Sequence, residues 1–123
     1  MAFAPPRKVA YAFSTDPDKI YTITDWPGGE DRIAPKTPTT IQYQPDSVSS
    51  FKWGYELDLS TDDKITALKL LLDPDQERPF YVETNIDTEM AKLPKSVLDV
   101  TSDYIKAIFE HALLEIENGV HMY

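Results

Sequence analysis

Residues 93–117 read LPKSVLDVTSDYIKAIFEHALLEIE, which is the pattern of one long amphipathic helix. Ser96 is a typical N-terminal cap, and Asp99 three residues later completes a capping box. The apolar side chains recur with the helical period: Val97, Val100, Tyr104, Ile105, Ile108, Phe109, Ala112, Leu113 and Ile116. Asn118 and Gly119 predict a left-handed stop. A helix with such a wide apolar face needs other elements to cover it.

Four short segments ahead of this helix have the character of β-strands. They are residues 9–14 (VAYAFS), 20–26 (IYTITDW), 39–43 (TTIQY) and 51–55 (FKWGY). The first two alternate apolar with small or polar side chains, which is the period of a strand. Pro17 presets its backbone angle, so we predict a turn at residues 15–19 and a β-hairpin around it. Residues 26–32 predict an exposed loop, because Pro27 and two glycines interrupt a ladder.

A shorter helix is predicted after residues 60–63, where Ser60 caps an acidic first turn. An apolar stripe of about three turns follows at Ile65, Leu68 and Leu72. Residues 75–92 are polar and mixed, which predicts a loop with a brief strand at residues 80–82.

These elements predict an α+β fold. A small mixed or antiparallel sheet, formed by the hairpin and the further strands, packs on two helices. A chain of 123 residues is about one domain, which we place at residues 9–118. Residues 1–8 are then an irregular segment, and residues 119–123 are a tail.

The composition argues against several kinds of partner. With 12 basic and 21 acidic residues the net charge is -9, which disfavours nucleic acid and anionic membrane surfaces. No apolar run approaches the roughly 18 residues that span a bilayer, and residues 1–8 lack the apolar core of a signal peptide. We therefore expect a cytoplasmic protein. The absence of cysteine removes disulfides, thiolate metal sites and thiol nucleophiles.

No group of residues makes a complete metal site. His111 and Glu115 lie one helical turn apart, with Glu110 and His121 as distant helpers. A shared metal is one interpretation of this pair, and a solvated helix face is the other. The HExxH motif is absent, so we predict no metal and no other cofactor.

No catalytic residue is predicted either. The acid pairs Asp62–Asp63 and Asp73–Asp75 sit where caps and turns use carboxylates. The glycines of residues 26–29 offer a conceivable phosphate site, but the acidic residues at 30 and 31 would repel the ligand. Six aromatic residues form either a ligand cage or, more commonly in a small domain, the core: Tyr11, Phe13, Trp26, Tyr43, Trp53 and Tyr55.

Several ordered motifs carry a resemblance to a known family. They are residues 9–14 (VAYAFS), 25–28 (DWPG), 37–41 (TPTTI), 53–55 (WGY), 68–74 (LKLLLDP), 93–95 (LPK), Tyr104 and 111–113 (HAL). In this order they resemble the first lobe of the fungal chaperone-like proteins related to the seventy-kilodalton heat-shock family, within the actin-type ATPase superfamily. The similarity covers most of residues 9–118 and implies a truncated actin-like ATPase subdomain.

The resemblance also implies what is missing. Members of the family begin with a strand and a glycine- and threonine-rich turn that holds the triphosphate and its magnesium, whereas residues 2–8 here read AFAPPRK. Lys69 matches the family lysine that approaches the phosphates, so it is the nucleotide-binding residue that the resemblance suggests. ATP and magnesium enter only on that interpretation, and we expect no ATP hydrolysis by this chain alone.

A function hypothesis follows from the resemblance. A lobe without its neighbouring strands leaves sheet edges and a helix face uncovered, and a protein partner or a second copy would cover them. We expect a non-catalytic, chaperone-related protein-binding fragment that self-associates, with partner contacts at Tyr104, Ile108, Phe109 and Leu113. The alternatives are a residual ATP-binding module completed by a second chain, and a fungal effector or elicitor.

Overall fold

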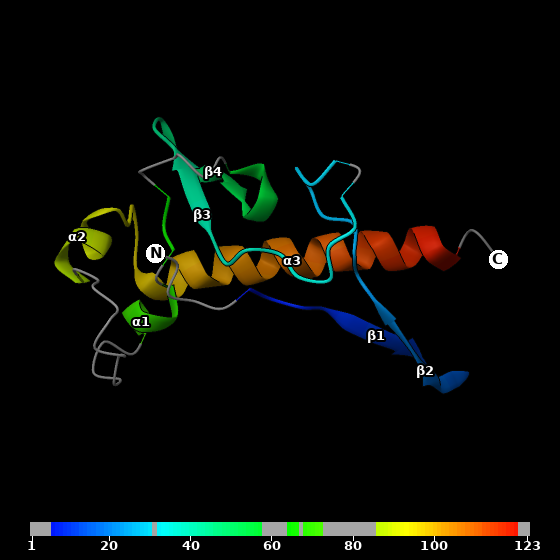
Figure 1. The fold of residues 1–123 in the computed structure, drawn as a ribbon. Coiled ribbons are helices and arrows are strands. Elements are labelled where there is room, and N and C mark those ends of the chain that lie inside the picture. Colours follow the sequence, from blue (N-terminus) through cyan, green and yellow to red (C-terminus); the bar gives the residue numbers. More distant parts are fainter. Residues whose placement is uncertain (1–5, 31, 58–63, 67, 73–85, 121–123) are drawn as a thin grey trace.

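The computed structural model describes residues 6–30, 32–57, 64–66, 68–72 and 86–120. In chain order their strands and helices are β1 (Ala10–Phe13), β2 (Asp16–Thr22), β3 (Ile41–Gln44), β4 (Ser47–Trp53), a short 3-10 helix (Gly54–Glu56), α1 (Leu68–Leu72), α2 (Ile86–Ala91) and α3 (Val97–Val120). Figure 1 shows the long helix α3 in the middle, with the β3–β4 hairpin above it and the β1–β2 hairpin below it. The described part is therefore a small α+β fold, as the sequence predicts.

The strands form two separate antiparallel sheets instead of the one sheet predicted. Among the described strands β1 pairs only with β2, and β3 pairs with β4 in a register that places Ile41 opposite Trp53. The chain between the hairpins folds back on itself, since the Trp26 indole nitrogen donates a hydrogen bond to the Ala34 carbonyl at 2.9 Å. This folded connection carries the chain from one hairpin to the other without a continuous ladder.

The first hairpin turns earlier than predicted. Its turn lies at Ser14 and Thr15, and residues 16–19, which we predicted as the turn, form the first half of β2. Pro17 is tolerated in β2 because an edge strand can lack a donor without breaking a ladder. The strand that we predicted to extend to residue 26 ends at Thr22.

Two predictions about the middle of the chain are wrong. Ile65, assigned to a helix, forms an antiparallel bridge with Ile41, with hydrogen bonds of 3.2 and 2.8 Å between their backbones. The bridge buries both side chains almost completely and satisfies backbone groups on the open edge of β3. Residues 86–91, predicted as loop, form α2. The predicted cap at residues 60–63 and the predicted strand at residues 80–82 lie outside the described residues.

The long helix begins where predicted and ends later. The Ser96 hydroxyl accepts a hydrogen bond from the Asp99 backbone N–H at 3.1 Å, which confirms the predicted cap. The predicted stop is wrong, because α3 continues through Asn118 and Gly119 to Val120. A side chain at position 119 would meet only the Tyr11 hydroxyl, at 3.8 Å, so the helix has room there beside the β1–β2 hairpin.

One cluster of buried side chains joins the second hairpin, α1 and α3. Its members are Ile23, Trp26, Ala34, Ile41, Trp53, Ile65, Leu68, Leu71, Val100 and Tyr104. Trp26 and Trp53 meet edge to face, with ring centroids 6.3 Å apart. Of the six aromatic residues predicted as core or cage, these two are buried in the core, and the other four are half-buried.

Candidate functional site

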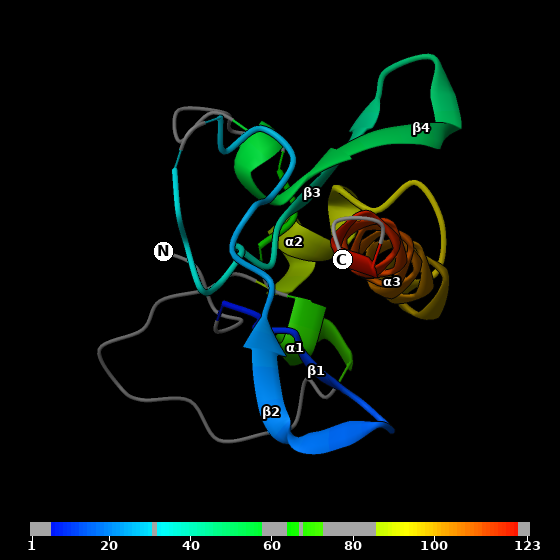
Figure 2. The same ribbon diagram turned by 90° about the vertical axis from the view of Figure 1, so that its right-hand side faces the viewer.

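A line of large apolar side chains on α3 is exposed to solvent. Leu98 exposes 73% of its surface, Ile105 and Phe109 60% each, and Leu113 44%. They lie one or two helical turns apart and so share one side of the helix, which we call the α3 stripe. Figure 2 looks along α3 and shows the β1–β2 hairpin, α1 and α2 together on one side of the helix. The exposed fractions show that no described element covers the stripe.

The opposite side of α3 packs into the core. Val100 and Tyr104 are buried there, and Ile108 is half-buried against the same cluster. The Tyr104 hydroxyl donates a hydrogen bond to the Pro38 carbonyl at 2.7 Å, and burial raises the pKa of Tyr104 to about 12. The phenol therefore stays a donor at neutral pH, and the bond fixes which side of α3 faces inward.

The four predicted contact residues lie in different environments. Tyr104 exposes only 3% of its surface, so its side chain does not reach a partner without rearrangement of the core. Phe109 and Leu113 belong to the α3 stripe. Leu98 and Ile105 were missing from the predicted set. Ile105 lies four residues before Phe109, and Leu98 lies seven residues before Ile105, so the helical period places both on the same line.

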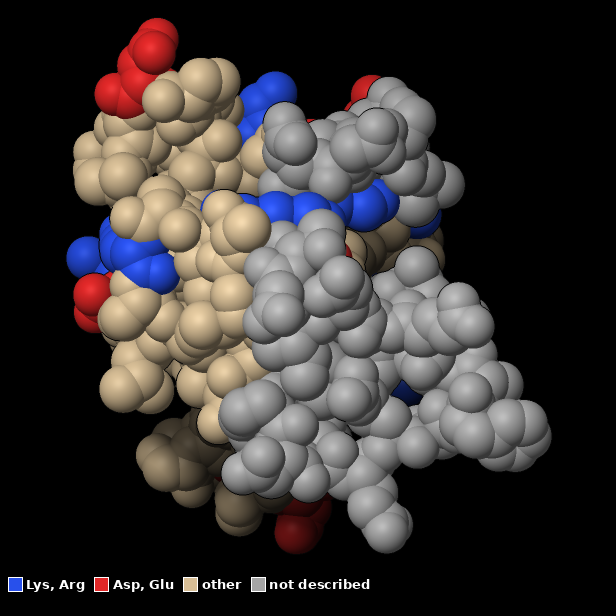
Figure 3. Space-filling model, turned by 90° about the vertical axis from the view of Figure 1, so that its left-hand side faces the viewer, with Lys and Arg blue, Asp and Glu red and all other residues tan. Residues whose placement is uncertain are grey.

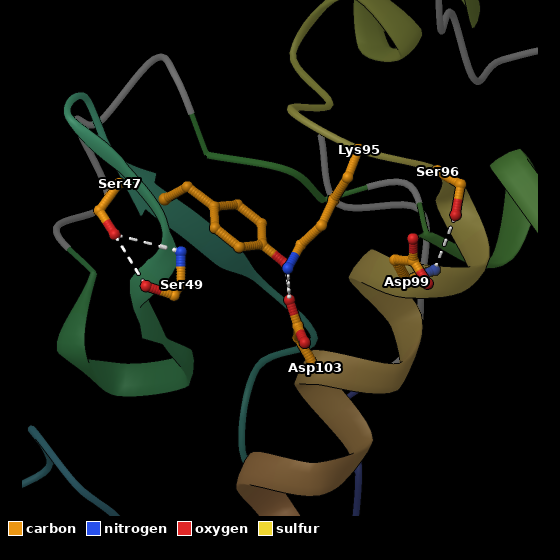
Figure 4. A network of polar contacts seen from close by, with 7 residues as sticks. Ser47, Ser49, Lys95, Ser96, Asp99 and Asp103 are labelled. Atoms are coloured by element: carbon orange, nitrogen blue, oxygen red, sulfur yellow. Dashed lines mark hydrogen bonds and ion pairs between the residues drawn. The ribbon is translucent and has the colours of Figure 1, made fainter.

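A polar network on the other flank ties the start of α3 to β3. The Tyr43 hydroxyl donates a hydrogen bond to the Asp103 carboxylate, which also accepts one from the Lys95 ammonium at 2.6 Å. Figure 4 shows Lys95 and Asp103 pointing toward one another, beside the Ser96 cap. Burial alone would raise the pKa of Asp103, but the bonds from Lys95 and Tyr43 outweigh it and lower that pKa. Burial, followed by the bond to Asp103, raises the pKa of Tyr43.

The charged side chains of α3 are mostly acidic. Asp99, Asp103, Glu110, Glu115 and Glu117 are acidic, and Lys106 is the basic residue of the helix. Lys106 and Glu110 face each other across one turn at 3.9 Å, and both are largely exposed. Such an exposed pair contributes little to the fold and remains available to a partner.

His111 and Glu115, for which a shared metal was one interpretation, have a structural role. The Nε2 atom of His111 lies 2.6 Å from the Asp25 carbonyl oxygen and 3.8 Å from the Glu115 carboxylate. Because a carbonyl only accepts hydrogen bonds, Nε2 carries the proton and has no lone pair for a metal. The imidazole packs against Trp26 and Trp53. Within the described part of the chain no three His, Cys, Asp or Glu side chains gather, and His121 lies outside it.

The glycine loop is packed against backbone. Gly28 has a φ of 80°, and a Cβ there would lie 2.6 Å from the Glu56 nitrogen. The glycine therefore allows this loop to pack closely against the 3-10 helix. This packing explains the glycine without a role in phosphate binding. Trp26 at the start of this loop is buried, so the prediction of a wholly exposed loop is wrong.

The remaining residues considered as site candidates lie where the structure gives no side chain. Lys69 falls within α1, but its side chain is outside the described part, as are the acid pairs at residues 62–63 and 73–75.

Among the described residues, no helix is long and apolar enough to cross a membrane.

Comparison of the chain with protein-family models, with curated proteins and with solved structures gives no match. The resemblance to the heat-shock family, and the nucleotide role of Lys69 that it implies, therefore stay predictions.

Proposed function

We propose that this protein binds protein through the α3 stripe, and that a second copy of the chain occupies it, without catalysis. The observation that carries the proposal is the exposure of Leu98, Ile105, Phe109 and Leu113 on one side of the longest element. Single exposed apolar residues are ordinary, whereas a contiguous patch on the order of 400 Å² is of the size that serves as an interaction site.

The α3 stripe can pair with the stripe of a second copy whose helix runs antiparallel. A two-fold axis that crosses α3 at Phe109 sets this ring against its own copy and Ile105 against the partner's Leu113. The same axis places the charged residues that flank the α3 stripe in both copies on the same side of the helix pair. Lys106 and the partner's Glu110 are then separated by two residues of helical rise, about 3 Å along the axis, so each copy supplies one cation and one anion to the pairing.

The dimer is expected to be weak. A stable interface buries about 800 Å² on each partner, which is more than the four side chains of the α3 stripe supply by themselves. The same axis also brings Asp99 near the partner's Glu117, which is repulsive. We therefore expect a dissociation constant in the micromolar range, at or above about 1 μM.

Sedimentation equilibrium from about 10 to 500 μM, a range that brackets this affinity, tests the proposal. The wild type should move from monomer to dimer over this range, and Phe109→Glu should stay monomeric. Leu114→Glu is the matched control, because Leu114 is 54% exposed and lies on another side of α3, so it should dimerise as the wild type does. A wild type that is monomeric throughout, or a control that dissociates equally, would contradict the proposal.

The same experiment with ATP and magnesium distinguishes self-association through the α3 stripe from the alternative of an ATP-binding module. Self-association through the α3 stripe involves no nucleotide, so the mass distribution should not change. No described side chain supports nucleotide binding, and none supports the effector or elicitor alternative.

A further inference from the structure

A cavity lies beside the α3 stripe, where the N-terminal segment, α1 and α3 meet. Its volume is about 400 Å³, which lies near the lower end of the range for small-ligand sites. Most of its wall is apolar, with Val9, Leu68, Ile105 and Ile108 in the lining beside Arg7 and Lys8. An apolar chain of modest length would fill it.

The rim of this cavity is basic. Arg7 and Lys8 are adjacent, exposed and close to the apolar wall, and neither forms an ion pair with another described residue. Two adjacent cations at one cavity are notable in a chain with a net charge of -9. Figure 3 shows that Lys and Arg side chains also gather near the centre of the face at the α1 and α2 end of the molecule, with Asp and Glu at its edges.

The basic rim is held in place by backbone hydrogen bonds. Arg7 and Thr37 exchange two such bonds of 2.9 Å each, and the Val9 carbonyl accepts one from the Ile23 N–H at 3.0 Å. The segment that carries both cations is thus attached at either end. A backbone that is already positioned loses less conformational entropy when the site binds a ligand.

We infer that this cavity binds a small amphipathic carboxylate, with its apolar chain against Val9, Leu68 and Ile108 and its carboxylate at Arg7 and Lys8. Arginine matches a carboxylate with two parallel hydrogen bonds, and the neighbouring ammonium adds a second charge. A neutral chain of the same length gains only the apolar contacts, and a cationic one meets repulsion at the rim. The carboxylate thus accounts for both the apolar wall and the cationic rim.

A titration followed by amide NMR shifts tests the inference with octanoate, octanol and octylammonium as probes. Octanoate should bind saturably with a dissociation constant of about 1 mM or lower, and its largest shifts should fall on residues 7–9 and on the α1 and α3 residues that line the cavity. Octanol should bind at least about fivefold more weakly, and octylammonium more weakly still.

Two double variants locate the carboxylate. Arg7→Gln with Lys8→Gln should reduce octanoate binding to the level of octanol and leave octanol binding unchanged. Lys36→Gln with Lys52→Gln removes the same charge from exposed residues that do not line the cavity, so octanoate affinity should stay within about twofold of the wild type.

Several results would overturn the inference: equal affinity for the three probes, an equal loss in the control variant, shifts centred elsewhere, or no saturation with octanoate. Ile105 lines the cavity and also belongs to the α3 stripe, so the titration is repeated on a variant that should not self-associate. Monomeric Phe109→Glu should retain octanoate binding, so failure of the dimer and failure of the ligand site give different outcomes.

Discussion

Replacement of Gly54 by alanine should destabilise the fold strongly. Gly54 has a φ of 59°, in the left-handed region, and a Cβ there would lie 2.5 Å from the buried Thr37 Oγ1. The conformation costs alanine about 1–2 kcal/mol, and a reduction of unfolded-state entropy returns about 0.4–1. The forced contact adds about 1–3 kcal/mol, because Thr37 is fully buried and has little room to move. We expect a net loss of about 1–5 kcal/mol in the free energy of unfolding.

Urea unfolding, followed by far-ultraviolet circular dichroism and tryptophan fluorescence, measures this loss. Gly119→Ala is the matched control, because Gly119 lies in α3 and its Cβ would meet only an ordinary contact at 3.8 Å. Alanine in a helix is favoured over glycine, so this variant should be unchanged or more stable by up to about 1 kcal/mol.

A double variant separates the contact from the backbone strain. Thr37→Ala removes the atom that the new Cβ approaches, so Gly54→Ala should cost about 1–3 kcal/mol less in that background. A loss below about 0.5 kcal/mol for Gly54→Ala alone would refute the reasoning. A destabilised Gly119→Ala would instead support the left-handed stop that the sequence predicts and the structure does not contain.

Two further predictions concern α3. Ile108→Asp places a charge on the half-buried side of the helix and should lower the free energy of unfolding by several kcal/mol, about 2–4, while an unchanged melting temperature would contradict the packing of this side chain. Asp103 has a lowered pKa in the folded state, so its stabilisation is present above its unfolded pKa near 4 and is lost as the pH falls through the folded value. Asp103→Asn should therefore lower the free energy of unfolding at pH 7 by about 1 kcal/mol, and this free energy should fall less steeply than in the wild type below pH 4. A variant whose stability falls below pH 4 as steeply as that of the wild type would refute this.

The local sequence determined those features that depend on neighbouring residues. The Ser96 cap and the period of the apolar positions after it place the start and the length of α3 closely, because capping and amphipathicity act within a few turns. The strand alternation predicted the first hairpin, whereas the further strands were predicted without their pairing as a second hairpin. The turn of the first hairpin was displaced, since Pro17 fits an edge strand as well as it fits a turn.

The tertiary structure alone decided which apolar side chains are buried. Tyr104 and Phe109 belong to the same apolar pattern, yet the first is buried and the second is 60% exposed, because the core contacts only one side of α3. Ile65 fits a helical stripe, but the open edge of β3 pairs with its backbone. Periodicity gives the side of a helix on which a residue lies, whereas the identity of its neighbours depends on contacts between residues distant in the chain. The α3 stripe and the cavity near Arg7 follow from those contacts, and the sequence predicted only two of the four stripe residues.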